Sequence, residues 1–297
     1  MRIVIAVVFS TLVNAQILVS DLVDAVNSDG ILIKYLKDAS VPYSGRVYNN
    51  YPNGNRELQG NYLRGLKEGK WVWWHTNGNK HKVGYYTQSI EDSLWQWWFA
   101  NGQLKKRGKY LESAKGGRWI EWYDNGVLYK SYPYSNNKLN GKYIEKYKNG
   151  KNKSEVLYRN NDKSGIEKFW LENGQPDYEY RWKDGVREGL QIDWGKSGLV
   201  IYKHNYRKGV FHGEFKEYYS NGQEAVTGIY KIGKKQGKWT WNYKEGLVAL
   251  TGNYKNDSPV GTWYWIRANK SEMRTVDFPN IDWVNDRIRE WEKIYNQ

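Results

Sequence analysis

The chain has 297 residues, with 46 Lys and Arg against 32 Asp and Glu, so its net charge is +14. Aromatic residues make up 16% of it, the mean hydropathy is −0.88 and there is no Cys. This composition excludes disulfides, Cys-ligated metals and a Cys nucleophile, and so many aromatic residues argue against disorder. No run of about 18 apolar residues occurs, so we expect no helix that spans a membrane.

The N-terminus has the pattern of a short secretory signal. Met1-Arg2 is followed by a mostly apolar stretch from Ile3 to Val13, and Val13-Asn14-Ala15 supplies small residues before a cut. The pattern predicts a signal peptide over residues 1–15 and an exported mature chain in the periplasm, on the cell surface or outside the cell. Residues 16–44 then predict an N-terminal capping hairpin, with strands over 22–26 and 31–36.

A 24-residue repeat occupies residues 45–278, and we number its positions from 0. Position 17 is aromatic in all ten repeats, and Asn-Gly stands at positions 8 and 9 in seven of them. The residues at position 0 are Gly45, Gly69, Ser93, Gly117, Gly141, Gly165, Gly189, Gly213, Gly237 and Gly261. Self-similarity at a fixed period indicates a repeat architecture.

Each repeat predicts one β-hairpin. Asn-Gly favours a type I′ turn, so we expect strands at positions 1–7 and 10–18 and a loop at 19–23. The register then pairs position 2 with 15, 4 with 13 and 5 with 12, and places the Trp at position 2 over the Gly at position 15 of the same hairpin. Because one hairpin alone is marginally stable, the hairpins must stack. The fold class is therefore all-β, an elongated single-sheet solenoid of ten hairpins.

Side-chain alternation assigns the residues to two faces of the sheet. We expect positions 2, 4, 6, 13, 15 and 17 on face one and positions 1, 3, 5, 10, 12, 14 and 16 on face two. Trp74, Trp98 and Trp122 then form a column on face two with steps of about 10 Å, or two strands. The candidate binding residues are Trp74, Trp98, Trp122, Trp170, Trp194, Lys70, Lys105 and Arg118. The alternative is that these rings only support the fold.

The last segment, residues 279–297, predicts a capping helix. Ile281, Val284, Ile288, Trp291 and Tyr295 recur three and four residues apart, which is typical of an amphipathic helix over about 281–295. We expect this helix to close the exposed edge of the sheet. A helix that binds a partner is the alternative.

The repeats resemble the MORN repeats in their bacterial variant form. The segment from Gly69-Lys70-Trp71 through Asn77-Gly78 to Gly84-Tyr85-Tyr86 carries the resemblance, and Gly237-Lys238-Trp239 through Gly252-Asn253-Tyr254 repeats it. The lead-in at Pro42-Tyr43-Ser44-Gly45 is similar to that of secreted members in Bacteroidetes-like bacteria. The resemblance implies a scaffold or binding role; some relatives carry an antitoxin label, and eukaryotic ones are linked to membranes.

Catalytic patterns are scarce. The four His lack the spacing of a metal site, and there is neither a Gly-x-Ser-x-Gly motif nor a phosphate loop. Acids recur at position 4 as Glu121, Glu145, Asp193 and Glu217, and a hydrolase built on Glu121 and Glu145 is the catalytic alternative. We expect no catalytic residue, no metal and no cofactor.

The leading functional hypothesis is an exported, non-enzymatic repeat scaffold. It would bind a protein or a polysaccharide of the cell envelope through an aromatic and basic face. The alternatives are an antitoxin-like inhibitor protein and a protein that binds anionic lipid at a membrane surface. Nucleic acid would suit the positive charge, but export argues against it.

Overall fold

The computed structural model describes residues 16–270 and 272–295, so the predicted signal peptide lies outside the described residues. These residues are all-β with one α-helix at their C-terminal end, as the sequence predicts. The chain divides into two units, residues 1–138 and 139–297, and each is described by itself. Within the described ranges, no helix is long and apolar enough to cross a membrane.

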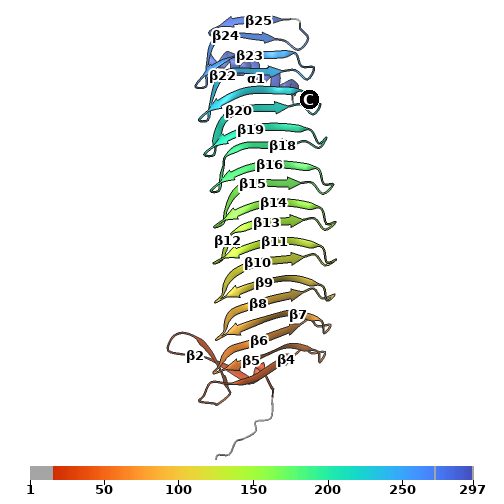
Figure 1. The fold of residues 1–297 in the computed structure, drawn as a ribbon, viewed down its shortest axis with the longest axis vertical. Coiled ribbons are helices and arrows are strands. Elements are labelled where there is room, and N and C mark those ends of the chain that lie inside the picture. The colour runs from red at the N-terminus through yellow and green to blue at the C-terminus, as the bar shows by residue number, and fades with distance from the viewer. Residues whose placement is uncertain (1–15, 271, 296–297) are drawn as a thin grey trace, which may run out of the picture. The chain divides into compact units, whose positions relative to one another are not determined.

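The first unit is an open antiparallel sheet of consecutive hairpins behind an N-terminal segment (Figure 1). That segment contains β1 (Ile17–Leu18), the 3₁₀ turn η1 (Val19–Asp21) and a hairpin of β2 (Leu22–Val26) and β3 (Leu32–Leu36). The repeats supply β4 (Gly45–Asn50), β5 (Arg56–Leu63), β6 (Leu66–Trp74), β7 (Lys80–Thr87), β8 (Ile90–Trp98), β9 (Leu104–Leu111), β10 (Ala114–Trp122) and β11 (Leu128–Ser135). The division between the units falls at β12 (Lys138–Leu139).

The second unit continues the same hairpin pattern and ends in the helix. Its strands are β13 (Gly141–Lys146), β14 (Asn152–Arg159), β15 (Asp162–Trp170), β16 (Pro176–Lys183), β17 (Val186–Arg187), β18 (Gly189–Trp194), β19 (Val200–Arg207), β20 (Val210–Tyr218), β21 (Glu224–Lys231), β22 (Lys234–Asn242), β23 (Val248–Lys255), β24 (Ser258–Ile266) and β25 (Met273–Asp277). The helix α1 spans Ile281–Tyr295, the range that its periodicity predicts.

Both kinds of turn differ from the prediction of a type I′ turn at Asn-Gly and a loop at positions 19–23. At the Asn-Gly turns only the Gly has a positive φ, for example Gly54 at 86°, and its N–H donates to the carbonyl of Tyr51. This is the pattern of a type I turn with Gly in the left-handed region. The loop expected at positions 19–23 is instead a tight turn at 19 and 20, where both residues have positive φ, as Gln88 and Ser89 do. These are the type I′ turns, and they lie at the opposite edge of the sheet from the Asn-Gly turns (Figure 1).

The Asn of the Asn-Gly turn connects successive repeats. The Oδ1 atom of Asn101 accepts the N–H of Gln103 at 3.0 Å, and its Nδ2 atom donates to the carbonyl of Asp124 in the next repeat at 3.1 Å. Asn53, Asn77, Asn149 and Asn221 make the same two bonds. Asn is therefore required for its side chain and not for a positive φ.

The Trp at position 2 covers the Gly of the preceding repeat, and the prediction that it covers the Gly of its own hairpin is wrong. The Cα atoms of Trp71 and Gly84 do pair within one hairpin. A Cβ atom added to Gly60, however, would lie 2.1 Å from the ring of Trp71, and one added to Gly84 would lie 2.2 Å from the ring of Trp95. The cause is a bulge at position 0, where Gly69 has φ of 67° and Gly60 faces three residues, 69–71.

The sizes at these two positions are complementary along the chain. Gly at position 15 is followed by Trp at position 2 in the pairs Gly60 and Trp71, Gly84 and Trp95, Gly108 and Trp119, Gly228 and Trp239, and Gly252 and Trp263. Where position 2 is smaller, position 15 is larger, as in Val156 and Glu167, Tyr180 and Gln191, and His204 and Phe215. Gln191 is 2% exposed and bonds the backbone of Arg181 through both ends of its amide.

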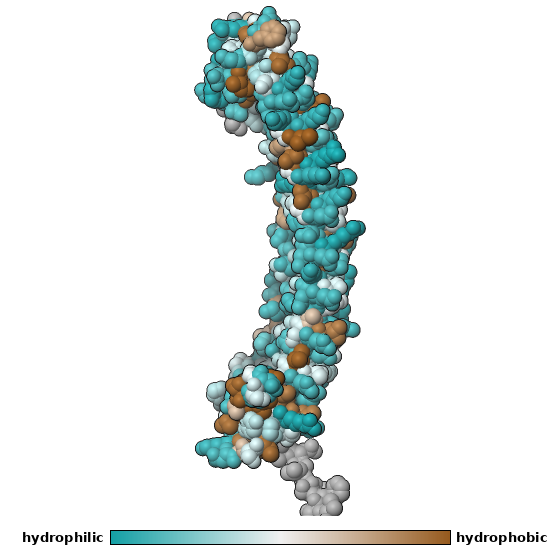
Figure 2. All heavy atoms as spheres, turned by 90° about the vertical axis from the view of Figure 1, so that its left-hand side faces the viewer, coloured by the Kyte–Doolittle hydropathy of each residue, from teal (hydrophilic) through white to brown (hydrophobic). Residues whose placement is uncertain are grey.

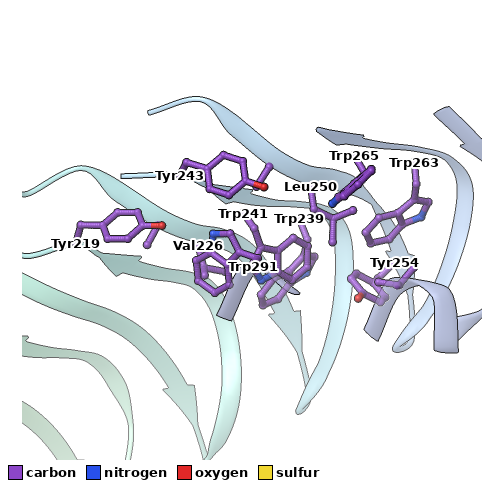
Figure 3. Packing of buried hydrophobic residues seen from close by; sticks show 13 residues of the cluster. Tyr219, Val226, Trp239, Trp241, Tyr243, Leu250, Tyr254, Trp263, Trp265 and Trp291 are labelled. Atoms are coloured by element: carbon purple, nitrogen blue, oxygen red, sulfur yellow. The ribbon is translucent and has the colours of Figure 1, made fainter. Parts of the chain in front are cut away.

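The helix α1 packs on face one of the last hairpins, so the prediction that it closes the sheet edge is wrong. Val284 and Trp291 are buried in a cluster with Trp239, Trp241 and Leu250, and Figure 3 shows Trp291 among these rings. The indole N–H of Trp291 donates to the carbonyl of Asn242 at 2.8 Å. A face of Trp rings offers the helix far more apolar area than a strand edge does, which explains the placement.

Candidate binding face

A second bulge, in the middle of each hairpin, decides which side chains share a face. In β10 and β11, Glu121 pairs with Lys130 as predicted, but Trp122 pairs with Leu128, so position 5 pairs with 11 instead of 12. Position 12 is thereby moved to face one, where His81 contacts His75 and Lys105 lies 5.3 Å from the ring centre of Phe99. The predicted pairing of position 5 with position 12, which would place His81 and Lys105 opposite the Trp column, is therefore wrong.

Five of the remaining candidates do share face two of the first unit. Trp74, Trp98 and Trp122 are half-buried at position 5, two strands apart, which gives steps of about 10 Å. Lys70 and Arg118 are exposed at position 1 of the same face. Their binding role stays a prediction.

Face two of the first unit is strongly basic. Positions 1, 3, 5, 11, 14 and 16 of its four repeats hold seven Lys and Arg and no Asp or Glu. The seven are Arg46, Arg56, Lys70, Lys80, Arg107, Lys109 and Arg118. None of the seven forms an ion pair within the part of the chain that the structure describes, and six are exposed. Two acids, Glu68 and Asp92, also lie on this face, because they pair across the strands with Asn61 and Tyr85 at position 16. The face is nevertheless net positive, and a net positive surface attracts anions.

Some of these cations lie beside the Trp rings. The guanidinium of Arg107 is 5.6 Å from the ring centre of Trp122, and the ammonium of Lys80 is 6.0 Å from that of Trp98. Arg56 lies 4.2 Å from the ring centre of Tyr48 and has a buried nitrogen, Nη1, without a hydrogen-bond partner among the described residues. The face therefore presents ring surfaces and cationic donors next to one another.

Face one of the first unit uses the same residue types in a different way. Trp71, Trp73, Trp95, Trp97 and Trp119 form a continuous row with ring centres 5.9 to 6.1 Å apart. Lysines lie over these rings, Lys82 at 3.9 Å from the centre of Trp73. Burial, with the nearby Lys67 as a smaller cause, lowers the pKa of Lys82. These lysines pack on the fold, because Trp71, Trp95 and Trp119 beneath them are fully buried.

Face two of the second unit is different because its charges are paired. Trp170 and Trp194 lie there at position 5 and are half-buried. The five repeats from 141 to 260 hold seven Lys and Arg at the six positions, but also four acids. Lys168 pairs with Glu179 at 3.1 Å, and Lys216 pairs with Glu224 at 3.1 Å. An aromatic and basic surface without ion pairs is thus a property of the first unit.

Five cations of the basic face were not among the sequence candidates, and one of them, Arg46, stands at position 1 like Lys70 and Arg118. Arg56 and Lys80 stand at position 11, which the predicted register leaves without an assigned face. Arg107 and Lys109 stand at positions 14 and 16, which the alternation already places on face two. Counting the charges on each predicted face would have identified Arg107 and Lys109. Arg56 and Lys80 could be assigned to face two only once the bulge was known.

The carboxylates at position 4 are held by neighbouring polar groups. Glu145 pairs with Lys153 at 2.9 Å, and Asp193 accepts the hydroxyl of Tyr180 at 2.6 Å. Burial raises the pKa of Asp193. Glu121 accepts the hydroxyl of Tyr132 and lies 3.6 Å from the ammonium of Lys106. No group of three or more His, Asp or Glu within the described ranges could hold a metal ion.

The comparisons with known proteins agree with the hairpin unit. No curated protein matches the chain. The chain is similar to one chain of the solved structure "Crystal Structure of TcdB2-TccC3-Cdc42", with 11% identity and a TM-score of 0.20, over 79% of this chain and 14% of that one. That TM-score carries no argument about fold or function.

Three segments, residues 91–112, 115–136 and 211–231, match the family model described as MORN repeat variant. Each segment covers one Asn-Gly hairpin except for the first residue of its first strand, β8 with β9, β10 with β11, or β20 with β21. The three matched segments are therefore similar to the MORN repeat variant, and each corresponds to one hairpin of the structural repeat.

Proposed function

We propose that the protein is a non-enzymatic repeat scaffold that binds an extended acidic polysaccharide through face two of its first unit. The observation that carries the proposal is the set of seven cations without ion pairs around Trp74, Trp98 and Trp122. The predicted signal peptide supports a location at the cell envelope, where such polymers occur.

The arrangement suits a polymer that lies across the strands. Leu104 and Leu128 stand between the Trp residues, as the cross-strand partners of Trp98 and Trp122. Ring faces and leucines match the apolar faces of sugar rings, and the flanking cations match carboxylates. Steps of about 10 Å between the Trp residues suit every second sugar of an extended 1,4-linked chain.

The test is binding of polygalacturonate, measured by calorimetry. The double variant Trp74→Ala, Trp98→Ala should weaken binding at least about tenfold, because each ring contact contributes on the order of 1 kcal/mol or more. The matched control is Trp170→Ala, Trp194→Ala, which removes the equivalent rings from the second unit and should leave the affinity unchanged.

Two results would oppose the proposal. An equal loss in both double variants would mean that the Trp residues act through the fold, and circular dichroism would show that loss as a change in the folded state. Unweakened binding by the variant Trp74→Ala, Trp98→Ala would show that face two is not the binding surface. A neutral chain such as cellohexaose should bind much more weakly than polygalacturonate, because it lacks carboxylates.

A second candidate is an anionic lipid surface. Face two of the first unit also exposes hydrophobic residues near the type I′ turns, among them Leu63 at 51%, Ile90 at 45% and Leu111 at 68%. Figure 2 looks onto the edge that carries these turns, where separate hydrophobic patches interrupt a mostly hydrophilic surface. Trp, Leu and basic residues on one surface favour a membrane interface. Sedimentation with phosphatidylglycerol vesicles, and none with phosphatidylcholine, would support this candidate.

A further inference from the structure

The N-terminal segment of the first unit forms a pocket against face one. The pocket has a volume of about 620 Å³, and its walls include Val19, Ile31, Leu32, Tyr62, Lys67 and Tyr86. It exists because the β2–β3 hairpin is fastened to the first type I′ turn. The N–H of Lys34 donates to the carbonyl of Gly65 at 3.0 Å, and the N–H of Gly65 donates to that of Tyr43 at 2.7 Å.

The approach of the two segments at this turn leaves no room for a side chain. Gly65 has φ of 77°, and a Cβ atom there would lie 2.3 Å from Cγ2 of Ile33. The pocket is therefore held open by a fixed contact. Its volume lies within the range of about 300 to 1,000 Å³ that is usual for small-molecule sites.

The two lysines of the pocket differ in their ion pairing. Lys67 forms no ion pair with any residue that the structure describes, although Lys34 beside it pairs with Asp24 at 2.7 Å. Burial, followed by the charge of Lys34, lowers the pKa of Lys67, and the charge of Glu91 opposes this shift. The ammonium of Lys67 lies 5.0 Å from the ring centre of Tyr86.

Two tyrosines, Tyr62 and Tyr86, line the same pocket. Tyr62 is 4% exposed, and its hydroxyl has no hydrogen-bond partner among residues 16–270 and 272–295, nor does that of Tyr86. Burial raises the pKa of both to about 12, with nearby carboxylates as smaller causes, so both are neutral donors at physiological pH. A hydroxyl that donates to no protein group can donate to a ligand that fills the pocket.

We propose that this pocket binds a small amphiphile with one carboxylate, such as a medium-chain fatty acid. The carboxylate pairs with Lys67 and accepts the hydroxyls of Tyr62 and Tyr86. The apolar chain packs on Val19, Ile31 and Leu32, of which Leu32 is 55% exposed without a ligand. Lys34, Lys67 and Glu91 give the lining a net charge of +1, which suits a single negative charge. This site is separate from the basic face and does not depend on its function.

The experiment is calorimetric titration of the full chain with decanoate. The variant Lys67→Gln should weaken binding about tenfold or more, since a hydrogen bond to a charged group contributes about 1.5 to 3 kcal/mol. The matched control is Lys115→Gln. Lys115 has the same repeat position, with its ammonium 5.2 Å from the ring centres of Trp119 and Tyr134, but the pocket does not include it. This control should bind decanoate like the unaltered protein.

Further measurements separate the head group from the apolar chain. Decylammonium should not bind, and Tyr62→Phe, which keeps the ring, should weaken decanoate binding severalfold. Equal binding of decanoate and decylammonium would overturn the proposal, because the pocket would then recognise only the apolar chain. Absence of decanoate binding, or an equal loss in Lys67→Gln and Lys115→Gln, would overturn it as well.

Discussion

At the scale of single residues, the fold depends on a size match between two repeat positions that lie in neighbouring hairpins. Gly84 is covered by the ring of Trp95, which is fully buried, while the equivalent Tyr180 stands over Gln191. The chain thus contains both solutions to the same packing problem. A large residue and a small one fill the space in either order, as close packing requires.

This match predicts a non-additive pair of substitutions. Gly84→Tyr alone should destabilise the protein by about 1 to 3 kcal/mol or more through overpacking, and Trp95→Gln alone by about 3 to 5 kcal/mol through a cavity. The double variant should cost clearly less than the sum, because it recreates the arrangement of Tyr180 and Gln191. Urea denaturation of the four proteins measures the coupling. Additive losses would show that the two positions do not share one space.

At the scale of elements, the hairpins were predictable, and their turns were not. The period, the pairing of position 2 with 15 and of 4 with 13, and the range of α1 all follow from the sequence. The type of the Asn-Gly turn was wrongly predicted because Asn-Gly is compatible with two turn geometries, and a side-chain bond across repeats decides between them. The type I′ turns were not predicted, because residues such as Gln88 and Glu112 rarely adopt positive φ.

The Asn bonds lead to a prediction for single hairpins. Asn101→Ala removes the bonds to Gln103 and Asp124 and should lower the free energy of unfolding by about 1 to 2 kcal/mol. The control is Ser197→Ala, since Ser197 occupies the same position and its one bond, to Leu199, is long at 3.5 Å. Chemical denaturation should show a markedly smaller loss for Ser197→Ala. Equal losses would contradict a stabilising role for the Asn amide.

At the scale of the whole molecule, one repeat is used for surfaces of different chemistry. In the first unit, lysines cover the Trp row on face one, while cations without ion pairs surround a second set of Trp residues on face two. In the second unit, acids such as Glu179 and Glu224 partly offset the basic residues of face two and form ion pairs with them. The net charge of +14 is therefore a poor guide to the site, and its distribution over faces is a good one.

The candidate site was only partly predictable, because a bulge changes the face on which the following residues lie. The Trp column with Lys70 and Arg118 follows from simple alternation along a strand. Lys105 was assigned to the wrong face, since one extra residue in a strand inverts the alternation beyond it. Nothing in the repeat pattern marks that bulge, because position 12 carries no constant residue type.

The most direct test uses pairs of neighbouring Trp residues that point to opposite faces. Hydroxyl-radical footprinting with and without polygalacturonate, read by mass spectrometry, reports on each ring separately. Trp74, Trp98 and Trp122 should be protected by the polymer, whereas Trp73 and Trp97, equally half-buried on face one, should not change. Protection of Trp73 and Trp97 in place of Trp74 and Trp98, or protection of none of them while the polymer is bound, would contradict the assignment of face two as the binding surface.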